Sequence, residues 1–333
     1  MKKGLQPLSL EGVKTYPLAQ RKSLVKVEDF ARPPLPRSSF KKFLTALPNF
    51  LAARDFREVV RRIVRAYRHE KPVILGMGAH PIKVGLSPLI LHLMEKKILH
   101  GLAMNGAGII HDFEIAFAGK TSEDVALEIG RGAFGMAEET GRIINEAINQ
   151  GRDKGWGIGR SVGEMIWKSK FPYRRMSLTA AGARLGIPIT VHVAVGTDII
   201  HMHPKSQGAA IGEGTHRDFR LFAAMISRLQ GGAYINLGSA VILPEVFLKA
   251  LTLVRNQGYE VKNFTTVNLD FISQYRPLTN VVRRPTLEGG KGFHFTGHHE
   301  IMFPLLIAAI LEEISPLTHR RGRGGRADSK SKF

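Results

Sequence analysis

From residue 72 onward, short apolar runs alternate with longer segments in which apolar residues recur at helical spacing. We expect strands at 72–77, 100–108, 187–196, 232–238 and 263–270. They are apolar almost throughout, as in strands that are buried on both faces. The segments between them, such as 87–99 and 244–258, have the spacing and length of helices. This alternation predicts an α/β fold with a mostly parallel sheet and helices on both faces.

The two ends of the chain depart from this pattern. Residues 1–45 are rich in Lys, Arg and Pro, and predict an extended N-terminal arm. Residues 317–333 form a Gly/Arg tail with almost nothing apolar to bury, and predict disorder. Such a tail is either simply solvated or a weak binding segment for RNA or an acidic partner. We expect one domain over 46–316, because no linker interrupts it.

Charge and composition narrow the function classes. The net charge is +20, of which +7 lies in residues 1–45 and +5 in residues 317–333. The net charge of the rest of the chain is moderate, which argues against a protein whose main domain binds nucleic acid. The chain has no cysteine, which excludes disulfides, thiolate metal sites and Cys nucleophiles and fits a cytoplasmic protein. We expect neither a membrane span nor a secretion signal, since no apolar run is long enough.

Ligands of parallel sheets bind beyond the carboxyl ends of the strands, so the loops after the strands are the candidate site. Glycine lies at or near the ends of four expected strands and permits close approach of a ligand. No loop has the full G-x-G-x-x-G spacing, so composition alone predicts dinucleotide binding only weakly. In NGAGIIHDFEIAFAG (105–119), we expect a small-residue turn and then a helix that opens at the His-Asp-Phe-Glu cluster.

Two other clusters have both a functional and a structural interpretation. His201 and His203 could be metal ligands, but no third ligand is fixed by spacing, so we expect loop histidines and no metal site. His298 and His299 precede the last expected helix, and one of them could face the site. Arginines and a lysine in the Pro/Gly-rich stretch 276–292 form either a solvated loop or an anion clamp. Its members are Arg276, Arg283, Arg284 and Lys291.

Over roughly 70–310, the order and spacing of these loops resemble the deoxyhypusine synthase family. The matching segments are VILGMGAHPIKVGLSPLI, GLAMNGAGIIHDFEIAFAG, IPITVHVAVGTDI, INLGSAVI, TTVNLD and MFPLLIAAI. The HDFE segment also resembles the Asn and His-Asp-Ile-Glu of archaeal-type ornithine cyclodeaminases, through Asn105, His111, Asp112 and Glu114. Both resemblances imply NAD and an amine that reacts through an imine.

The resemblance implies a Rossmann-like sheet, NAD as cofactor, and a homotetramer with cofactor sites near subunit contacts. In the family, the enzyme oxidises spermidine and a lysine carries the aminobutyl group as an imine. Carried over to matching positions, it implies these cofactor-binding residues: Gly78, His80, Lys83, Asn105, Gly106, Gly108, Thr197, Asp198, Gly238, Ser239 and Asn268.

The chain departs from the family in its substrate-binding part. No Trp-Gly pair precedes a lysine, so Lys291 after Gly290 is the only catalytic-lysine candidate in that region. His111 stands where the family has an acid and becomes the acid/base candidate, with Asp112 beside it. The acidic polyamine loop is replaced by SQYRPLTNVVRRP, which has no carboxylate. The candidate substrate-binding residues are His203, Arg276, Arg283, Arg284 and His298.

These observations leave three hypotheses. The first is an NAD-dependent enzyme that acts by hydride and imine chemistry on an amine-containing small molecule other than spermidine. The second is a true deoxyhypusine or homospermidine synthase whose lysine is relocated, to Lys291 or Lys205. The third is a non-catalytic NAD- or RNA-binding protein that uses its basic ends.

Overall fold

The computed structural model describes residues 4–314, so the predicted basic tail at 317–333 lies outside the described residues. The chain divides into two compact units, Met1–Arg54 and Asp55–Phe333. The first unit contains the short helices η1 (Leu18–Gln20), η2 (Val27–Asp29) and α1 (Phe40–Ala46), and most of its side chains are exposed. The second unit contains the sheet and all of the site considered below.

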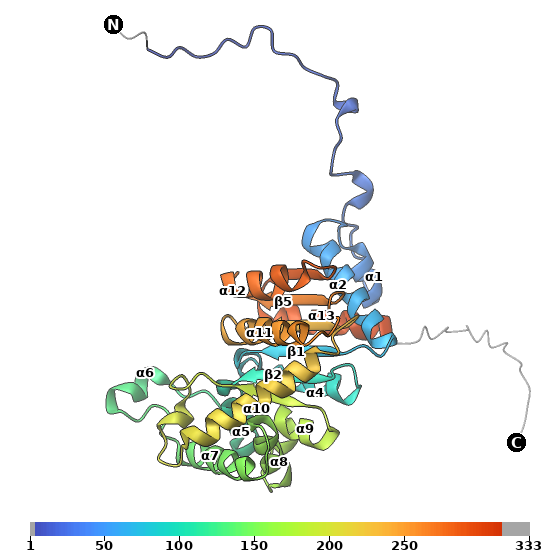
Figure 1. Cartoon of the computed structure of the whole chain (residues 1–333). Helices are drawn as coiled ribbons and strands as arrows, with labels where there is room; N and C mark the ends of the chain where they lie inside the picture. The colour runs from blue at the N-terminus through green and yellow to red at the C-terminus, as the bar shows by residue number, and fades with distance from the viewer. Residues whose placement is uncertain (1–3, 315–333) are drawn as a thin grey trace, which may run out of the picture. The chain divides into compact units, whose positions relative to one another are not determined.

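Six parallel strands form the sheet, in the order β3-β2-β1-β4-β5-β6 (Figure 1). They are β1 (Val73–Met77), β2 (Gly101–Asn105), β3 (Ile189–His192), β4 (Ala233–Leu237), β5 (Thr265–Asp270) and β6 (Lys291–Thr296). This is the strand order of the doubly wound dinucleotide-binding fold, in which the chain direction switches between β1 and β4. The predicted α/β, Rossmann-like architecture is confirmed.

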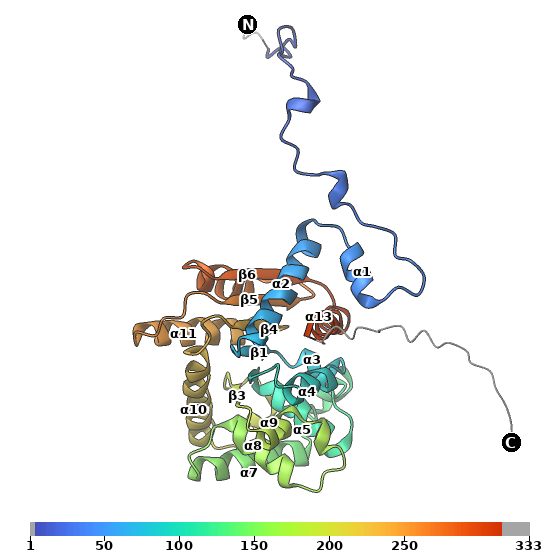
Figure 2. The ribbon, with the colours of Figure 1, turned by 90° about the vertical axis from the view of Figure 1, so that its right-hand side faces the viewer.

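Helices cover both faces of the sheet. In Figure 2, α10 and α11 lie on one side of the strands, and α3, α4 and α13 lie on the other. The longer helices are α2 (Leu51–Arg68), α4 (Ser87–Glu95), α5 (Gly106–Ala118), α7 (Glu138–Asp153), α8 (Ile158–Lys168), α9 (Leu178–Leu185), α10 (Gly208–Ile226), α11 (Ile242–Asn256) and α13 (His299–Ile314). The shorter ones are α3 (His80–Lys83), α6 (Val125–Glu128), η3 (Ile129–Arg131), η4 (Arg174–Met176), η5 (Ile199–Met202), α12 (Tyr275–Pro277), η6 (Leu278–Arg283) and η7 (Arg284–Thr286).

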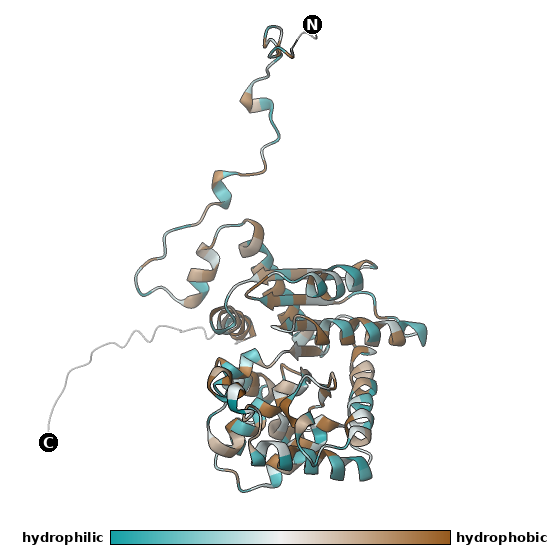
Figure 3. Ribbon diagram, turned by 90° about the vertical axis from the view of Figure 1, so that its left-hand side faces the viewer, coloured by the Kyte–Doolittle hydropathy of each residue, from teal (hydrophilic) through white to brown (hydrophobic). Residues whose placement is uncertain are grey.

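The strands are buried because both of their faces are covered. All residues of β1, β4 and β5 are buried. Figure 3 shows brown, hydrophobic segments within the layered part of the molecule, and teal on the outward faces of its helices. On one face, Tyr234 of β4 stacks on Phe247 of α11 with ring centroids 4.0 Å apart. Gly76 of β1 makes room for the Tyr234 phenol, since a Cβ there would collide with it. Within residues 4–314, no helix is both long and apolar enough to cross a membrane.

Two local predictions are wrong. Lys291–Thr296 is the edge strand β6, whereas we expected no strand in this region. Helix α5 begins at Gly106 and not at His111, because the Asn105 side chain accepts a hydrogen bond from Gly108 N and caps the helix there. The His-Asp-Phe-Glu cluster therefore lies in the second turn of α5, beyond the reach of the helix N-terminus.

Candidate functional site

The turns after β1 and β4 meet at the carboxyl edge of the sheet, at the switch in chain direction. Gly78 N donates to the carbonyl of Leu237 at 3.1 Å. A Cβ on Gly78 would lie 2.6 Å from the carbonyl oxygen of Gly238, so the two turns come as close as backbone allows. Gly238 has φ +65°, which glycine adopts without strain. Two of the predicted cofactor residues thus form the centre of this edge.

Two histidines and an aspartate converge on these turns. His80, the first residue of α3, places its Nδ1 2.8 Å from Nδ1 of His299, the first residue of α13. His299 is fully buried, and its Nε2 lies 3.7 Å from the Asp270 carboxylate at the end of β5. A Cβ on Gly238 would lie 2.5 Å from His299 Cε1, so His299 packs directly over that turn. Four loop segments therefore bring one titratable cluster together.

The environment of His299 indicates which nitrogens carry protons. Burial, the largest effect, lowers the pKa of His299, while nearby Asp270 opposes this shift. In the tautomer of His299 that carries its proton on Nε2, this N–H points toward the Asp270 carboxylate without forming a hydrogen bond, and Nδ1 is an acceptor. His80 then donates from Nδ1, and its Nε2 keeps a free lone pair. No described residue forms a hydrogen bond with that Nε2.

Apolar side chains are exposed beside this cluster. The ring of Phe271 lies 5.6 Å from His80 and 5.7 Å from His299, yet 45% of its surface is exposed. Val241 and Tyr275, from the loops after β4 and β5, are exposed as well. A planar ligand ring could cover this surface.

Asp198 approaches the start of α5 from the loop after β3. Its carboxylate lies where a Cβ on Gly106 would be, so glycine is required there. Burial raises the pKa of Asp198, and the charge of His201 opposes the rise. Asp198 Oδ2 is buried and has no hydrogen-bond partner among the described residues. It is an acceptor next to the end of β2, where this fold binds the ribose of a dinucleotide.

His111 belongs to a hydrogen-bonded network on α5. Its Nδ1 lies 2.6 Å from Thr121 Oγ1, and Thr121 donates to Glu114, which also accepts from Thr140 Oγ1 at 3.1 Å. Burial, followed by the charge of Lys83, lowers the pKa of His111 to about 4. His111 is therefore neutral near pH 7 and can accept or donate a hydrogen bond, but it binds a proton weakly.

Asp112 does not join this group, and its predicted catalytic role is corrected. Its carboxylate is buried and accepts four hydrogen bonds at the start of α9, from the backbone N–H groups of Leu178 and Thr179 and the hydroxyls of Ser177 and Thr179. Burial raises its pKa while these donors oppose the rise. Asp112 anchors α9, and both of its oxygens are buried and engaged there.

Three other predicted cofactor residues use their side chains within the fold. Asn268 is fully buried and lies in register between Asn236 and His294, to which its amide is bonded at 2.7 and 2.9 Å. Asn105 caps α5, and the Ser239 hydroxyl accepts from Leu243 N at the start of α11. These residues shape the edge, while Thr197 and Lys83 have exposed side chains there.

Two arginines of the predicted clamp share one polar network. Arg276 lies 3.4 Å from Glu245, and Arg284 donates at 3.0 Å to Asn280, whose amide donates to the same Glu245 at 2.8 Å. Arg283 is the last residue of η6 and Arg284 the first of η7. Lys291 is the first residue of β6, at the amino edge, and pairs with Glu58 at 2.6 Å. Its predicted catalytic role is corrected, because the whole length of the strand separates it from the site.

The remaining predicted substrate residues are spread along the carboxyl side. His203 pairs with Glu138 at 3.2 Å, and His298 is largely exposed beside Glu300. The sequence did not single out Asp270, since a strand-terminal Asp carries no special signal. It gave His80 only as a cofactor-binding residue. Residues 4–314 contain no group of three or more His, Asp or Glu side chains placed to hold a metal.

No protein-family model and no curated protein matches the sequence. Solved structures that resemble it include ArgZ, an arginine dihydrolase of the ornithine-ammonia cycle in cyanobacteria, at 15% identity and a TM-score of 0.49, over 79% of this chain. A candidate LOR/SDH protein from Methanococcus maripaludis S2 has 14% identity and a TM-score of 0.48, and the match covers 78% of this chain and 70% of that one.

A candidate deoxyhypusine synthase from Entamoeba histolytica has 12% identity and a TM-score of 0.48, over 82% of this chain and 93% of that one. The similar structures thus include a candidate member of the family that the sequence resembles. The chain spans 33% of the length of ArgZ. At these identities and scores the comparisons do not assign a function to this chain.

Proposed function

We propose that this chain is an NAD-dependent enzyme that transfers hydride at an amine-bearing carbon of a small molecule. The observation that carries the proposal is the His80–His299–Asp270 cluster at the point where a β3-β2-β1-β4-β5-β6 sheet changes direction. In this strand order, that point is where dinucleotides bind. Oxidation of an amine or alcohol there requires a base that takes up a proton. His80, supported by His299 and the Asp270 carboxylate, could be that base.

The residues at this edge fit NAD in part. Gly78 and Gly238 keep the two central turns free of side chains, and Asp198 Oδ2 is an acceptor for a ribose hydroxyl near the end of β2. Two features depart from the usual dinucleotide site. Pro81 stands where the third glycine of the fingerprint would be, and α3 after β1 has only four residues. We therefore assign the pyrophosphate to the backbone of both central turns and not to a helix N-terminus.

The protein's own groups would handle the proton. NAD, when bound, accepts a hydride from the carbon that is oxidised. His80 Nε2 takes the proton that leaves the substrate nitrogen, which yields an imine. His299 lies between His80 and Asp270, so the charge gained by His80 is balanced through His299 by the carboxylate. His111 lies elsewhere on this edge and would position substrate as a neutral hydrogen-bonding group.

Fewer of the predicted substrate-binding residues are placed to contact a substrate than the sequence indicated. Two arginines of the expected clamp, Arg276 and Arg284, already contact Glu245 and Asn280, so the clamp favours an anionic substrate less than the sequence indicated. The segment 273–285 has no carboxylate, which still argues against a polyamine. An aminobutyl transferase would need a lysine at this edge. Lys291 cannot supply it, while Lys205 remains a candidate.

Two further proposals concern assembly. The resemblance to the deoxyhypusine synthase family implies a homotetramer, which sedimentation would test. A weak RNA or acidic partner for the basic tail is a separate proposal, tested by truncation of residues 317–333, which should leave NAD binding unchanged.

The proposed function is tested by calorimetric titration of NAD into the wild-type chain and the His80→Ala and Gly238→Ala variants. We expect Gly238→Ala to weaken NAD binding, because its Cβ displaces His299. His80→Ala should keep NAD binding and lose turnover of amine substrates. Gly186→Ala is the matched control, because Gly186 has a similar φ of +71° and open space around its Cβ position. Equal NAD binding by the wild type and Gly238→Ala would contradict the proposed site.

A further inference from the structure

A cavity of about 820 Å³ lies at the amino edge of the sheet, opposite the proposed NAD site. Its floor consists of the segments that lead into β1, β4 and β5, namely Lys71, Gly231 and the run 263–265. Its wall is the C-terminal half of α2. The volume is in the range of small-molecule sites.

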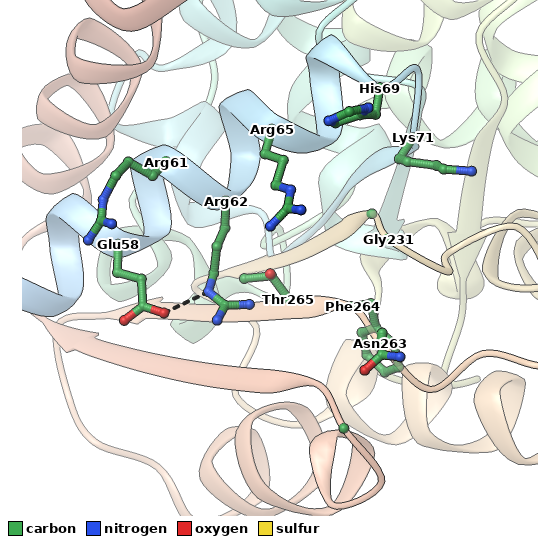
Figure 4. A pocket seen from close by; sticks show the side chains of 12 residues that line it. Glu58, Arg61, Arg62, Arg65, His69, Lys71, Gly231, Asn263, Phe264 and Thr265 are labelled. Atoms are coloured by element: carbon green, nitrogen blue, oxygen red, sulfur yellow. Dashed lines mark hydrogen bonds and ion pairs between the residues drawn. The ribbon is translucent and has the colours of Figure 1, made fainter.

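The cavity is strongly basic. Four cationic side chains line it, Arg61, Arg62, Arg65 and Lys71, together with one carboxylate, Glu58. In Figure 4, Arg62 and Arg65 reach from α2 towards the strand ends. The one carboxylate is already engaged, since Glu58 pairs with Arg62 at 2.8 Å and with a lysine of β6. Those two partners lower the pKa of Glu58, which is therefore a stable anion.

Most of the positive charge has no counterpart within the fold. No described residue forms an ion pair or hydrogen bond with the side chains of Arg65, His69 or Lys71. The partial negative charge at a helix C-terminus stabilises nearby cations, but this stabilisation is small and does not explain four cationic side chains. Both ends of the chain carry a net positive charge as well, +7 in residues 1–45 and +5 in residues 317–333. These exposed cations are therefore available to an anion from outside the chain.

We propose that this cavity binds a small polyanion with two or three adjacent phosphate groups. A phosphate monoester carries about −1.5 to −2 at pH 7, so two phosphates match the excess of three positive charges. Arginine guanidinium groups also bind phosphate oxygens in pairs, with fixed geometry. The four cations line one cavity, which favours a compact ligand over a nucleic-acid strand. This site is separate from the proposed NAD site.

The probe is inorganic triphosphate, titrated calorimetrically into the full chain at fixed salt. We expect one bound triphosphate per chain, and an affinity that falls about tenfold for each of Arg61→Gln and Arg65→Gln, since bonds to charged groups are lost. Both residues are exposed, so the variants should fold, and Lys71→Gln provides a third test. Arg175→Gln, an exposed arginine outside the cavity, is the matched control and should leave the affinity unchanged.

Four results would overturn the proposal. They are absence of triphosphate binding, an equal loss in the Arg175→Gln control, tighter binding of a single-stranded RNA through the same arginines, and loss of NAD binding in the Arg61→Gln or Arg65→Gln variant. The last result would mean that the cavity is the dinucleotide site. Unchanged NAD affinity in these variants supports two separate sites. Failure of NAD to bind the wild type would contradict the proposed function and leave the triphosphate result standing.

Discussion

Replacement of Asp112 by alanine tests whether this carboxylate anchors a helix or takes part in chemistry. In the structure, it accepts from Leu178 N at 2.7 Å and Thr179 N at 3.1 Å, and from the hydroxyls of Ser177 and Thr179. All of these groups are buried. The alanine variant leaves the two backbone donors at the start of α9 without an acceptor.

The magnitude follows from the number of donors left unpaired. The two hydroxyls can bond to each other, since Ser177 Oγ and Thr179 Oγ1 are already 3.1 Å apart. The two buried N–H groups then cost about 1–3 kcal/mol each. Burial raises the pKa of Asp112, so removal of the carboxylate also recovers some desolvation energy. We therefore expect a loss of about 2–4 kcal/mol in the free energy of unfolding, a large part of a domain's typical ~5–15 kcal/mol.

The assay is equilibrium unfolding in urea, with the midpoint and slope compared between variants. Asp112→Asn should lie between the wild type and Asp112→Ala, because an amide retains one acceptor oxygen. Asp153→Ala, at the exposed end of α7, is the control and should change stability by less than about 0.5 kcal/mol. Unchanged stability in Asp112→Ala, together with loss of activity, would refute the structural role.

Three further predictions concern the two edges of the sheet. Gly186→Ala should destabilise the fold by about 1–2 kcal/mol through backbone strain alone. Gly238→Ala should destabilise it more, because its Cβ also meets the buried His299. Thermal unfolding of both variants measures the difference. The pKa of His111 is about 4 in the folded chain and 6.5 in the unfolded chain. Between pH 4 and pH 6.5, the imidazole is therefore protonated in the unfolded chain and neutral in the folded one. Stability should therefore fall by about 1.4 kcal/mol for each pH unit from 6.5 down to 4 relative to His111→Gln, and an NMR titration in which His111 charges near pH 6.5 would refute this. Borohydride trapping with amine substrate and NAD should leave Lys291 unmodified in peptide mass spectra, and modification there would contradict its assignment to the amino edge.

Periodicity predicted the sheet well because buried parallel strands are apolar and their helices amphipathic. All five expected strands occur, and their parallel arrangement follows from the helices between them. Strand β6 was missed because it lies at the edge and alternates: Phe293 and Phe295 are buried, while Lys291 and Thr296 are exposed. The two phenylalanines two residues apart were the available signal, but the Gly- and Arg-rich surroundings indicated a loop.

The site was predicted less completely, because spacing along the chain does not show where a side chain points. Gly78 and Gly238 were correctly placed at the strand ends, where backbone geometry demands glycine. Asp112 follows His111 directly, yet on a helix neighbouring residues point about 100° apart, so one lines the edge and the other enters the core. Asp270 and His299 are distant in sequence and meet only through the fold.

A crystal structure of the chain with NAD would show whether the dinucleotide binds where the sheet changes direction. We expect the pyrophosphate over the turns at Gly78 and Gly238, a ribose hydroxyl on Asp198, and the nicotinamide within reach of His80. NAD bound instead in the basic cavity beside Arg61 and Arg65, or the absence of NAD at saturating concentration, would contradict it.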